Sequence, residues 1–549
     1  MNLETKQCQN CKQDFAIKSE DFDFYEKIKV PVPTFCPECR LQRRLSYRNE
    51  RMLYHRACDL CGKDAISIYH PSGKNVVYCR ECWWSFDKWD PMSYAKDYDF
   101  SKPFFTQFYE LANAVPRNGL INSNSVNSEY TNLAADNKDC YMLFESSNNE
   151  RCNHSYWMQL SKDCLDCAFV NNSELCYEVF VAWNCYKLFF SKECRDCTDS
   201  YFLQDCVGCS NCYGCVGLRQ KQHYIFNKPY SKEEYSEKIK EFKTEDFKKE
   251  FKDFVLTQIN KYAYIQKSVR STGNYLLNTK NCMSCFHGYD AENCKFGYHV
   301  WRNSKDCMDV CTVGRDAELV YESINSAMKA YDIKFGIQNW NGNNGLTYCE
   351  ACSGSSDLFG CVSLHAKQYC ILNKQYTKDE YKKLVPKIIA HMDEMPYTDK
   401  KGGVYVYGEF YPAELSQFIY NETSAFDHFP LSKEQAIAHG FSWRDREEKN
   451  VAVGGDVIEC SHQGKCADNC TIGFKIIQAE QDFYNKMGLP IPTLCPNCRH
   501  HERLKQRNPL KLWHRQCMKP GCPNEFETSY APDRPEIVYC EQCYNNEVA

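Results

Sequence analysis

The sequence lacks several features that would place the protein in a common functional class. No apolar run approaches the ~20 residues that a membrane-spanning helix needs. The first residues lack the apolar core of a signal peptide. There is also no P-loop, no Gly-x-Gly-x-x-Gly fingerprint, no His-Glu-x-x-His motif and no nucleophile elbow. These absences favour a cytoplasmic protein without enzymatic activity.

The chain also lacks an excess of positive charge, but it is rich in cysteine. Its 549 residues carry a net charge of −5, so a surface that binds nucleic acid would have to be local. Thiols stay reduced in the cytoplasm, and we therefore interpret the 38 cysteines as metal ligands or small buried hydrophobic residues. The alternative, a secreted protein stapled by disulfides, would need a signal peptide.

The stretch Phe24–Cys58 recurs as Phe483–Cys517, with 18 of its 35 positions identical. Each copy lies in a block with four cysteine pairs, and a closely spaced pair can supply two corners of a tetrahedral zinc site. We therefore predict tandem zinc ribbons at residues 1–115, with a trailing helix, and at 456–549. The predicted metal ligands are Cys8, Cys11, Cys36, Cys39, Cys58, Cys61, Cys79, Cys82, Cys466, Cys470, Cys495, Cys498, Cys517, Cys522, Cys540 and Cys543.

These sixteen cysteines predict four zinc ions per chain. The spacing leaves open whether successive pairs share an ion or whether the pairs are cross-braced. The spacing of Cys466 and Cys470 is wider than in the N-terminal block. Cys460 and His462 lie just upstream, and either could replace a ligand there.

Cysteines recur between the two blocks at residues 140, 164, 185 and 206, which are separated by 24, 21 and 21 residues. Short aromatic and β-branched runs lie between them. A fixed period of this kind predicts a parallel β-helix, with rungs of about 21 to 24 residues. Asp139, Asp163, Asp205 and Asp306 each precede a cysteine of this ladder, a periodicity typical of turn residues.

The central region is itself duplicated, because Lys221–Tyr235 matches Lys367–Tyr381. Capping boxes at Ser231 and Thr377 predict that a helix follows each half. We predict a mainly β protein, in which a β-helix-like solenoid of two duplicated halves with helical inserts is flanked by zinc-ribbon pairs. The predicted segments are solenoid half A at 116–230, a helical insert at 231–268, half B at 269–372, a helix at 373–395 and a bridging segment at 396–455.

The run Cys206, Cys209, Cys212 and Cys215 resembles the spacing of iron–sulfur ligands. In the second half, however, Cys209 is replaced by Ser355 and Cys212 by Leu358 in the corresponding rung. We therefore interpret these cysteines as space-filling residues.

Arginines are gathered in the duplicated stretch. Arg40, Arg44 and Arg48 are spaced to share one face of a short helix. Such a face suits contacts with phosphates. The predicted nucleic-acid-binding residues are Arg40, Arg44, Arg48 and Arg56, with their copies Arg499, Arg503, Arg507 and Arg515. The alternative is that these arginines pair with carboxylates of the ribbons or of the solenoid.

The Cys-Pro-x-Cys-Arg blocks, the Asn/Ser-Lys-Asp-Cys rungs and the Lys-Gln-x-x-Ile-x-Asn-Lys tails resemble a family of cysteine-rich zinc-ribbon proteins from candidate-phyla-radiation bacteria. The resemblance covers nearly the whole chain. It implies this architecture and a cytoplasmic setting, and it implies no activity.

Three functional hypotheses remain. The first is a non-enzymatic zinc scaffold that binds nucleic acid, with RNA favoured, through ribbons at both ends of a rigid solenoid. The second is a scaffold for a protein partner or for a homo-oligomer, in which zinc is only structural. The third is a carbohydrate-active β-helix enzyme. No membrane partner is expected.

Overall fold

The computed structural model describes residues 4–326, 328–445 and 454–548. The chain divides into two compact units, and each contains one solenoid half and one pair of ribbons. Unit 1 consists of Met1–Gly119 and Ala263–Arg444, and unit 2 consists of Leu120–Tyr262 and Asp445–Ala549. The N-terminal ribbons therefore belong with the second solenoid half and the C-terminal ribbons with the first. Most of the predicted bridging segment beyond Arg444 lies outside the described part of the chain.

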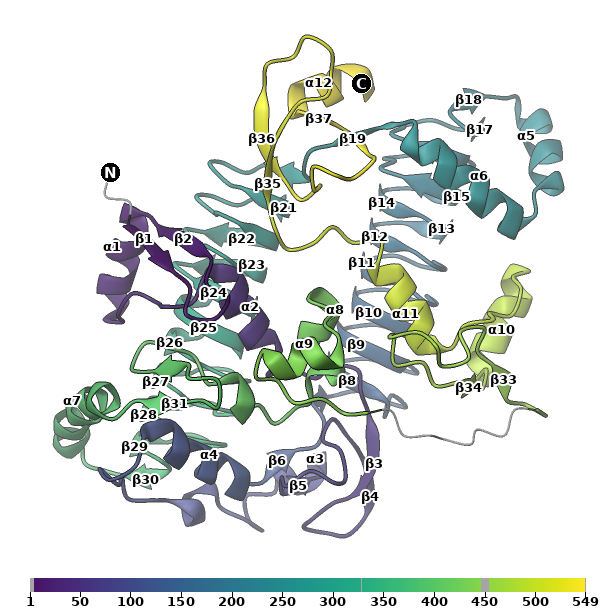
Figure 1. The fold of residues 1–549 in the computed structure, drawn as a ribbon. Coiled ribbons are helices and arrows are strands. Elements are labelled where there is room, and N and C mark those ends of the chain that lie inside the picture. Colours follow the sequence, from purple (N-terminus) through teal and green to yellow (C-terminus); the bar gives the residue numbers. More distant parts are fainter. Residues whose placement is uncertain (1–3, 327, 446–453, 549) are drawn as a thin grey trace. The chain divides into compact units, whose positions relative to one another are not determined.

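The solenoid of unit 2 is a stack of short parallel strands, and the final pairing, β17 with β18, is antiparallel. Figure 1 shows these strands lying one above the next. The strands are β7 (Asn122–Ser123), β8 (Thr131–Ala135), β9 (Tyr141–Ser147), β10 (Asn153–Gln159), β11 (Ala168–Asn171), β12 (Phe180–Trp183), β13 (Tyr186–Phe189), β14 (Lys192–Arg195), β15 (Thr198–Gln204), β16 (Tyr213–Val216), β17 (Tyr224–Ile225) and β18 (Lys228–Pro229).

The solenoid of unit 1 has the same design, including an antiparallel last pairing of β29 with β30. Its strands are β20 (Ile265–Gln266), β21 (Gly273–Leu277), β22 (Cys285–Glu292), β23 (Tyr298–Lys305), β24 (Met308–Val313), β25 (Glu318–Ser326), β26 (Tyr331–Lys334), β27 (Asn344–Thr347), β28 (Ser356–Phe359), β29 (Gln368–Ile371) and β30 (Lys374–Gln375). The predicted fold class, a mainly β protein built on a parallel solenoid, is confirmed.

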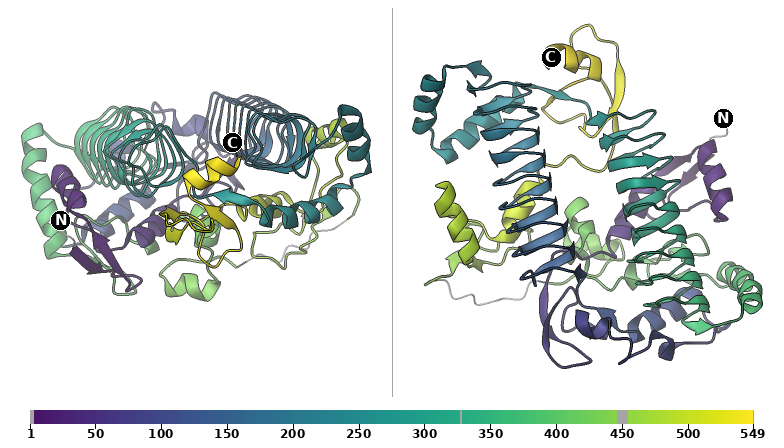
Figure 2. Two further views of the ribbon diagram at one scale, coloured as in Figure 1. Left: turned by 90° about the horizontal axis from the view of Figure 1, so that it is seen from above. Right: turned by 180° about the vertical axis from the view of Figure 1, so that it is seen from behind.

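The rungs are much shorter than predicted. Tyr156 pairs with Ala168, and Ala168 pairs with Phe180, so one rung of this solenoid takes 12 residues. Rungs of the other solenoid take 12 or 13 residues, as in the pairing of Cys311 with Ile324. Figure 2 shows a solenoid end-on as superimposed closed turns. The predicted rung length was wrong because the wider cysteine gaps, such as that from Cys140 to Cys164, span two rungs.

The backbone of the solenoid repeats every three residues. Asp139, Met142 and Glu145 have φ values of 55°, 51° and 50°, which lie in the left-handed region. The residue after each of them, such as Cys140 or Leu143, points inward and is buried. Left-handed residues turn the chain sharply, so four three-residue sides close one rung.

Aspartate and asparagine tolerate the left-handed region better than most residues. Asp139, Asp163, Asp205 and Asp306 have φ values of 55°, 50°, 50° and 50°. Their interpretation as turn residues is therefore confirmed.

Cysteine fills many inward positions, where so short a rung leaves little space. The Cys167 thiol, for example, lies 3.4 Å from the carbonyl oxygens of Leu165 and Cys176, to which it can donate. Burial raises the pKa of the Cys140 thiol to about 11, which disfavours the reactive thiolate. None of the 38 cysteines, all of which lie in the described residues, is paired in a disulfide.

Cys206, Cys209, Cys212 and Cys215 occupy the four inward positions of one rung. Each thiol lies between 3.4 and 3.6 Å from backbone carbonyl oxygens. Within the described residues, these four thiols do not form a group close enough to share a metal ion. Their interpretation as space-filling residues agrees with this arrangement.

Within each unit, further short strands and helices accompany the solenoid (Figure 1). Ser231 accepts a hydrogen bond from the backbone N–H of Glu234, and Thr377 accepts one from Glu380, which confirms both predicted capping boxes. In unit 1 the remaining elements are β1 (Glu4–Gln7), β2 (Asp14–Ile17), α1 (Ser19–Ile28), α2 (Pro37–Leu45), β3 (Tyr54–Ala57), β4 (Asp64–Ser67), β5 (Val77–Tyr78), α3 (Arg80–Trp83), η1 (Pro91–Tyr94), α4 (Phe104–Ala114), β6 (Arg117–Asn118), α7 (Lys378–Glu394), β31 (Tyr397–Thr398), β32 (Val404–Tyr405), η3 (Ala413–Leu415), η4 (Tyr420–Glu422), α8 (Ser424–His428) and α9 (Lys433–Ala438).

The C-terminal ribbons of unit 2 repeat much of this pattern. The remaining elements of that unit are α5 (Lys232–Lys238), η2 (Ile239–Glu241), α6 (Thr244–Leu256), β19 (Ile259–Lys261), β33 (Ile458–Glu459), β34 (Gly473–Phe474), α10 (Gln478–Met487), α11 (Pro496–Leu504), β35 (Trp513–Gln516), β36 (Glu525–Thr528), β37 (Ile537–Tyr539) and α12 (Glu541–Val548). None of the helices that the structure describes is long and apolar enough to cross a membrane.

The three-residue period can be tested with two neighbouring side chains. Leu188 is fully buried, whereas the side chain of Lys187 is 41% exposed. We expect Leu188→Ala to reduce the free energy of unfolding by about 2–5 kcal/mol, because it leaves a cavity. We expect Lys187→Ala to change it by less than about 0.5 kcal/mol. Denaturant unfolding of both variants measures this difference, and equal effects would contradict the inward assignment.

Candidate metal centres

Four groups of four cysteines bring their sulfur atoms within 4.8 Å of one another. A zinc ion with four sulfur ligands at about 2.3 Å requires sulfur–sulfur distances of about 3.8 Å. The Sγ atoms of Cys11 and Cys36 lie 3.7 Å apart, and those of Cys61 and Cys79 lie 4.0 Å apart. The groups therefore fit zinc. They are Cys8/Cys11/Cys36/Cys39, Cys58/Cys61/Cys79/Cys82, Cys460/Cys470/Cys495/Cys498 and Cys517/Cys522/Cys540/Cys543.

Successive cysteine pairs share a site in both blocks, so the sequential arrangement applies and cross-bracing does not. One hydrogen bond recurs in all four groups: the backbone N–H of the third cysteine donates to the sulfur of the first. The donor–acceptor distances are 3.2 Å for Cys36 to Cys8, 3.2 Å for Cys79 to Cys58, 3.3 Å for Cys495 to Cys460 and 3.3 Å for Cys540 to Cys517.

These donors favour the thiolate form that binds a metal. Burial acts to raise the pKa of Cys58, but N–H groups of Cys79, Cys61 and Leu60 outweigh it and lower the pKa to about 7. In the first site the third cysteine, Cys36, also caps α2, and Pro37 occupies the first helical turn. The positive end of a helix dipole then lies beside the sulfur atoms.

The third site differs from the prediction in one ligand. Cys460, not Cys466, joins Cys470, Cys495 and Cys498. Cys460 follows β33 as Cys8 follows β1, and it accepts the same recurring hydrogen bond. The sequence pointed to Cys460 as a possible substitute, but the widened spacing of the pair hid its equivalence to Cys8.

The arginines of the first ribbon are buried against carboxylates of the solenoid in unit 1. Helix α2 packs on β24 and β25 (Figure 1). Arg40 donates to Asp309 from Nε at 3.0 Å and from Nη2 at 2.7 Å. Arg44 donates to Asp309 at 3.3 Å and to Glu322 at 3.2 Å. These side chains are at most 2% exposed.

Two further arginines complete this arrangement. Arg43 lies 3.1 Å from Glu409 and 3.4 Å from Glu322. Arg48 lies beyond the end of α2, where it contacts Glu50 and donates to Thr312 at 2.6 Å. The face predicted to contact phosphate is therefore the face that docks the ribbon on its solenoid.

Unit 2 repeats this docking with the other copy of the stretch. Helix α11 packs on β10. Arg499 pairs with Asp166 and with Glu480, the latter at 3.1 Å. Arg503 lies 2.9 Å from Asp166 and 3.4 Å from Glu178.

Glu480 is also held from the solenoid side. Its carboxylate lies 3.0 Å from Nε2 of His154. Burial acts to raise the pKa of Glu480, but the neighbouring His154 and Arg499 side chains outweigh it and lower the pKa to about 2. The carboxylate is therefore ionised at neutral pH.

The acceptors are equivalent in the two units. Asp166 and Glu178 lie one rung apart, because the residues just before them, Leu165 and Tyr177, pair between rungs. Asp309 and Glu322 also lie one rung apart, because the residues just after them, Val310 and Ser323, pair between rungs. All four acceptors have left-handed φ values, of 54°, 52°, 54° and 38°. The predicted rung length of 21 to 24 residues hid these four acceptors, and the true period of 12 or 13 residues aligns them.

The other predicted nucleic-acid-binding residues also contact the chain itself. Arg56 lies 2.9 Å from Asp59, and Arg515 donates to the carbonyl of Ala531 at 3.2 Å. Arg507 is half-buried. For Arg40, Arg44, Arg48, Arg499 and Arg503 the alternative interpretation, ion pairs with the chain's own carboxylates, holds. Nucleic-acid binding stays a prediction.

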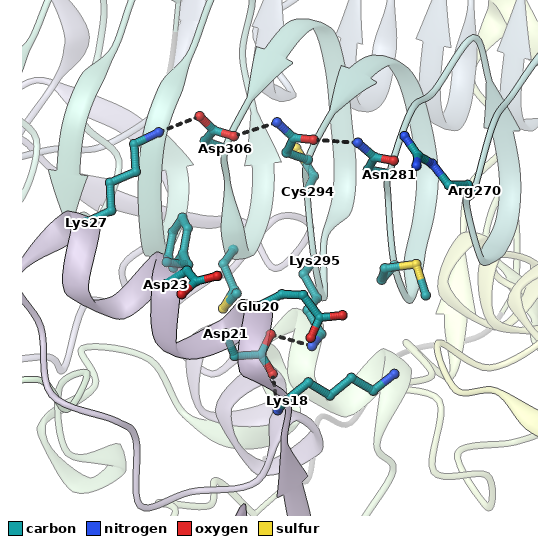
Figure 3. A pocket seen from close by; sticks show the side chains of 14 residues that line it. Lys18, Glu20, Asp21, Asp23, Lys27, Arg270, Asn281, Cys294, Lys295 and Asp306 are labelled. Carbon is teal, nitrogen blue, oxygen red and sulfur yellow. Dashed lines mark hydrogen bonds and ion pairs between the residues drawn. The ribbon is translucent and has the colours of Figure 1, made fainter. Parts of the chain in front are cut away.

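A cavity of about 670 Å³ lies between α1 and the solenoid of unit 1 (Figure 3). Four of the charged side chains that line it form two ion pairs with one another. Lys27 contacts Asp306 at 2.7 Å, and Lys295 contacts Asp21. The hydrogen bond from Lys27 to Asp306 raises the pKa of the lysine, which moves it further from neutrality.

The chain matches no known protein-family model, and no curated protein sequence is similar to it. The predicted family and bacterial group are therefore not identified by these comparisons. The features that stand are a cysteine-rich chain, a β-solenoid and four clusters of four cysteines.

Buried docking pairs should contribute far more to stability than exposed ones. Arg503→Leu would leave Asp166 buried with one arginine partner fewer. We therefore expect this substitution to lower the free energy of unfolding by about 3–5 kcal/mol. Arg151 pairs with Asp163 in the same solenoid, but its side chain is 43% exposed. We expect Arg151→Leu to lower the free energy of unfolding by less than about 1 kcal/mol. Denaturant unfolding of the two variants provides the comparison, and a neutral Arg503→Leu would refute the docking role.

Proposed function

We propose that the protein is a non-enzymatic scaffold whose zinc ions are structural, and that it presents its solenoids to a protein partner. The observation that carries this proposal is the docking of a ribbon helix on a solenoid by buried arginine–carboxylate pairs, which occurs in both units. The ribbons are thereby parts of the solenoid units, and the docked arginines are engaged within the chain.

The charges of the docking contact are closely matched. In unit 1, the guanidinium groups of Arg40, Arg43 and Arg44 meet the carboxylates of Asp309, Glu322 and Glu409. An arginine fork binds a carboxylate through two parallel hydrogen bonds, which fixes orientation as well as distance. Because the matched pairs are sealed from water, removal of one partner leaves an uncompensated buried charge. Such a contact suits permanent assembly within the chain.

The cavity in Figure 3 supports the non-enzymatic part of the proposal. An acid–base catalyst needs a group whose pKa lies near the working pH. The lysines of this cavity that contact Asp306 and Asp21 are held as ion pairs. Glu20, on its wall, has a pKa lowered mainly by a hydrogen bond from a backbone N–H group. The pKa of Lys27 is raised and that of Glu20 is lowered, so both are moved away from the range that proton transfer at neutral pH requires.

Structural zinc can be tested by its removal. We expect a strong chelator in mild denaturant to release the ribbon-bound zinc and to open the ribbons, because metal supplies much of the folding free energy of such small modules. Limited proteolysis should then cleave within residues 4–119 and 454–548, while the solenoid strands stay protected. Protein treated with zinc-saturated chelator is the control. An unchanged cleavage pattern after zinc release would contradict a structural role.

RNA binding is the alternative function, and it can be tested separately. The docked arginines cannot contact phosphate without leaving their carboxylates, so we expect no saturable RNA binding near physiological salt. The experiment titrates structured and single-stranded RNA at several salt concentrations with wild type and with Arg56→Gln plus Arg515→Gln. Binding that weakens steeply with salt, with a slope reduced by about one for each lost phosphate contact, would establish the RNA alternative.

A further inference from the structure

The third cysteine site has more metal-binding side chains than one zinc ion uses. Beside Cys460, Cys470, Cys495 and Cys498 lies a second group in which His462, Cys466, Asp468 and Cys498 bring one ligand atom each within 4.8 Å of the others. Cys498 belongs to both groups. Its sulfur lies 3.9 Å from that of Cys460 and 3.6 Å from that of Cys466.

We propose that this ribbon holds two metal ions, and that the thiolate of Cys498 bridges them. The inner ion is bound by the four cysteines of the ribbon. The outer ion is bound by His462, Cys466, Asp468 and the shared Cys498. Two sulfur atoms, one nitrogen and one oxygen form a donor set that suits zinc in tetrahedral geometry. The proposal does not depend on the scaffold function.

The polar atoms of the outer group support a ligand role. Nδ1 of His462 and Oδ2 of Asp468 are buried and have no hydrogen-bond partner. The ammonium group of Lys505 lies 3.5 Å from the same Oδ2, beyond a close ion pair. Buried polar atoms are costly when they are left unpaired, and a metal ion would pair both side chains at once.

The N-terminal copy provides an internal comparison. There, Cys8 and Cys11 are separated only by Gln9 and Asn10, and no second group is found among the described residues around that site. In the C-terminal copy, Cys460 and Cys470 enclose a longer loop, from which His462, Cys466 and Asp468 all come. The extra ligands are thus an addition to a ribbon that already has four cysteines.

The charges also favour a second ion. Five thiolates and one carboxylate around two divalent ions leave a net charge of −2, the same as one zinc ion held by four thiolates. With one ion alone, Asp468 would add a negative charge beside an already negative centre. His462, Cys466 and Asp468, which would bind only the outer ion, are half-buried, whereas the four cysteines of the inner site are buried. The outer ion should therefore exchange faster with solution.

The test compares the full-length wild type with His462→Ala/Cys466→Ser/Asp468→Asn, which removes the three ligands that bind only the outer ion. A second variant, Gln463→Ala/Lys465→Ala, changes the same loop without touching a proposed ligand. We expect five zinc ions per chain in the wild type and in the loop control, and four in the ligand variant. Release to a chelator should show one fast ion, which the ligand variant lacks.

Substitution with ¹¹³Cd identifies the bridge directly. A shared thiolate should give two cadmium resonances that are coupled to each other, and the ligand variant should lose both the coupling and one resonance. Four ions in both the wild type and the ligand variant would overturn the proposal, as would five in both. Four ions in the wild type and three in the ligand variant would also overturn it, because His462, Cys466 and Asp468 would then belong to the only ion of this ribbon.

Discussion

A left-handed residue at every third position is the constraint on which the rest of this structure depends. It folds the chain into three-residue sides, and four sides make one rung, as the pairing of Tyr156 with Ala168 shows. For a residue other than glycine, the left-handed backbone conformation costs about 1–2 kcal/mol of conformational free energy. Hydrogen bonds between rungs and the tight packing of small inward side chains have to offset that cost.

The same constraint places the charges that hold the ribbons. A side chain at a left-handed position recurs on the same side of the next rung, so Asp309 and Glu322 form a short acidic column. The arginines of α2 are spaced by one helical turn and engage two rungs at once. The ribbon and the solenoid rung thus fix one another: Cys36 of the cysteine site caps the start of α2, and the helix presents the arginines.

Much of this architecture could be predicted from the sequence, and the failures have physical reasons. Three of the four metal groups followed in full from cysteine spacing, and the fourth differs in one ligand, because two thiolates on one turn constrain local geometry strongly. The parallel solenoid followed from the recurrence of short strands. The rung length did not, because cysteine marks only some of the inward positions, and serine, leucine and valine fill the others.

Other features depend on long-range packing that no local pattern reports. The spacing of Arg40 and Arg44 revealed a shared helical face but not its partner, since a guanidinium suits a carboxylate as well as a phosphate. The grouping of Cys466 with Cys470 in one site was wrong for a similar reason. Five cysteines lie close together in that ribbon, and the position of Cys460 after β33 and its hydrogen bond from Cys495 identify it as the equivalent of Cys8.

The grouping of ribbons with solenoids sets an order of events during synthesis. Arg44 precedes its partner Asp309 by 265 residues, and Asp166 precedes Arg503 by 337. At about 5–20 residues per second, each partner waits on the order of 10–70 s on the ribosome for the other. During that time, the first ribbon exposes arginines that the finished protein buries. The first solenoid exposes Asp166 and Glu178, the carboxylates that later pair with Arg503. A nascent chain therefore transiently carries a ribbon with unpaired docking arginines followed by a solenoid with unpaired docking carboxylates, until translation supplies the matching partners.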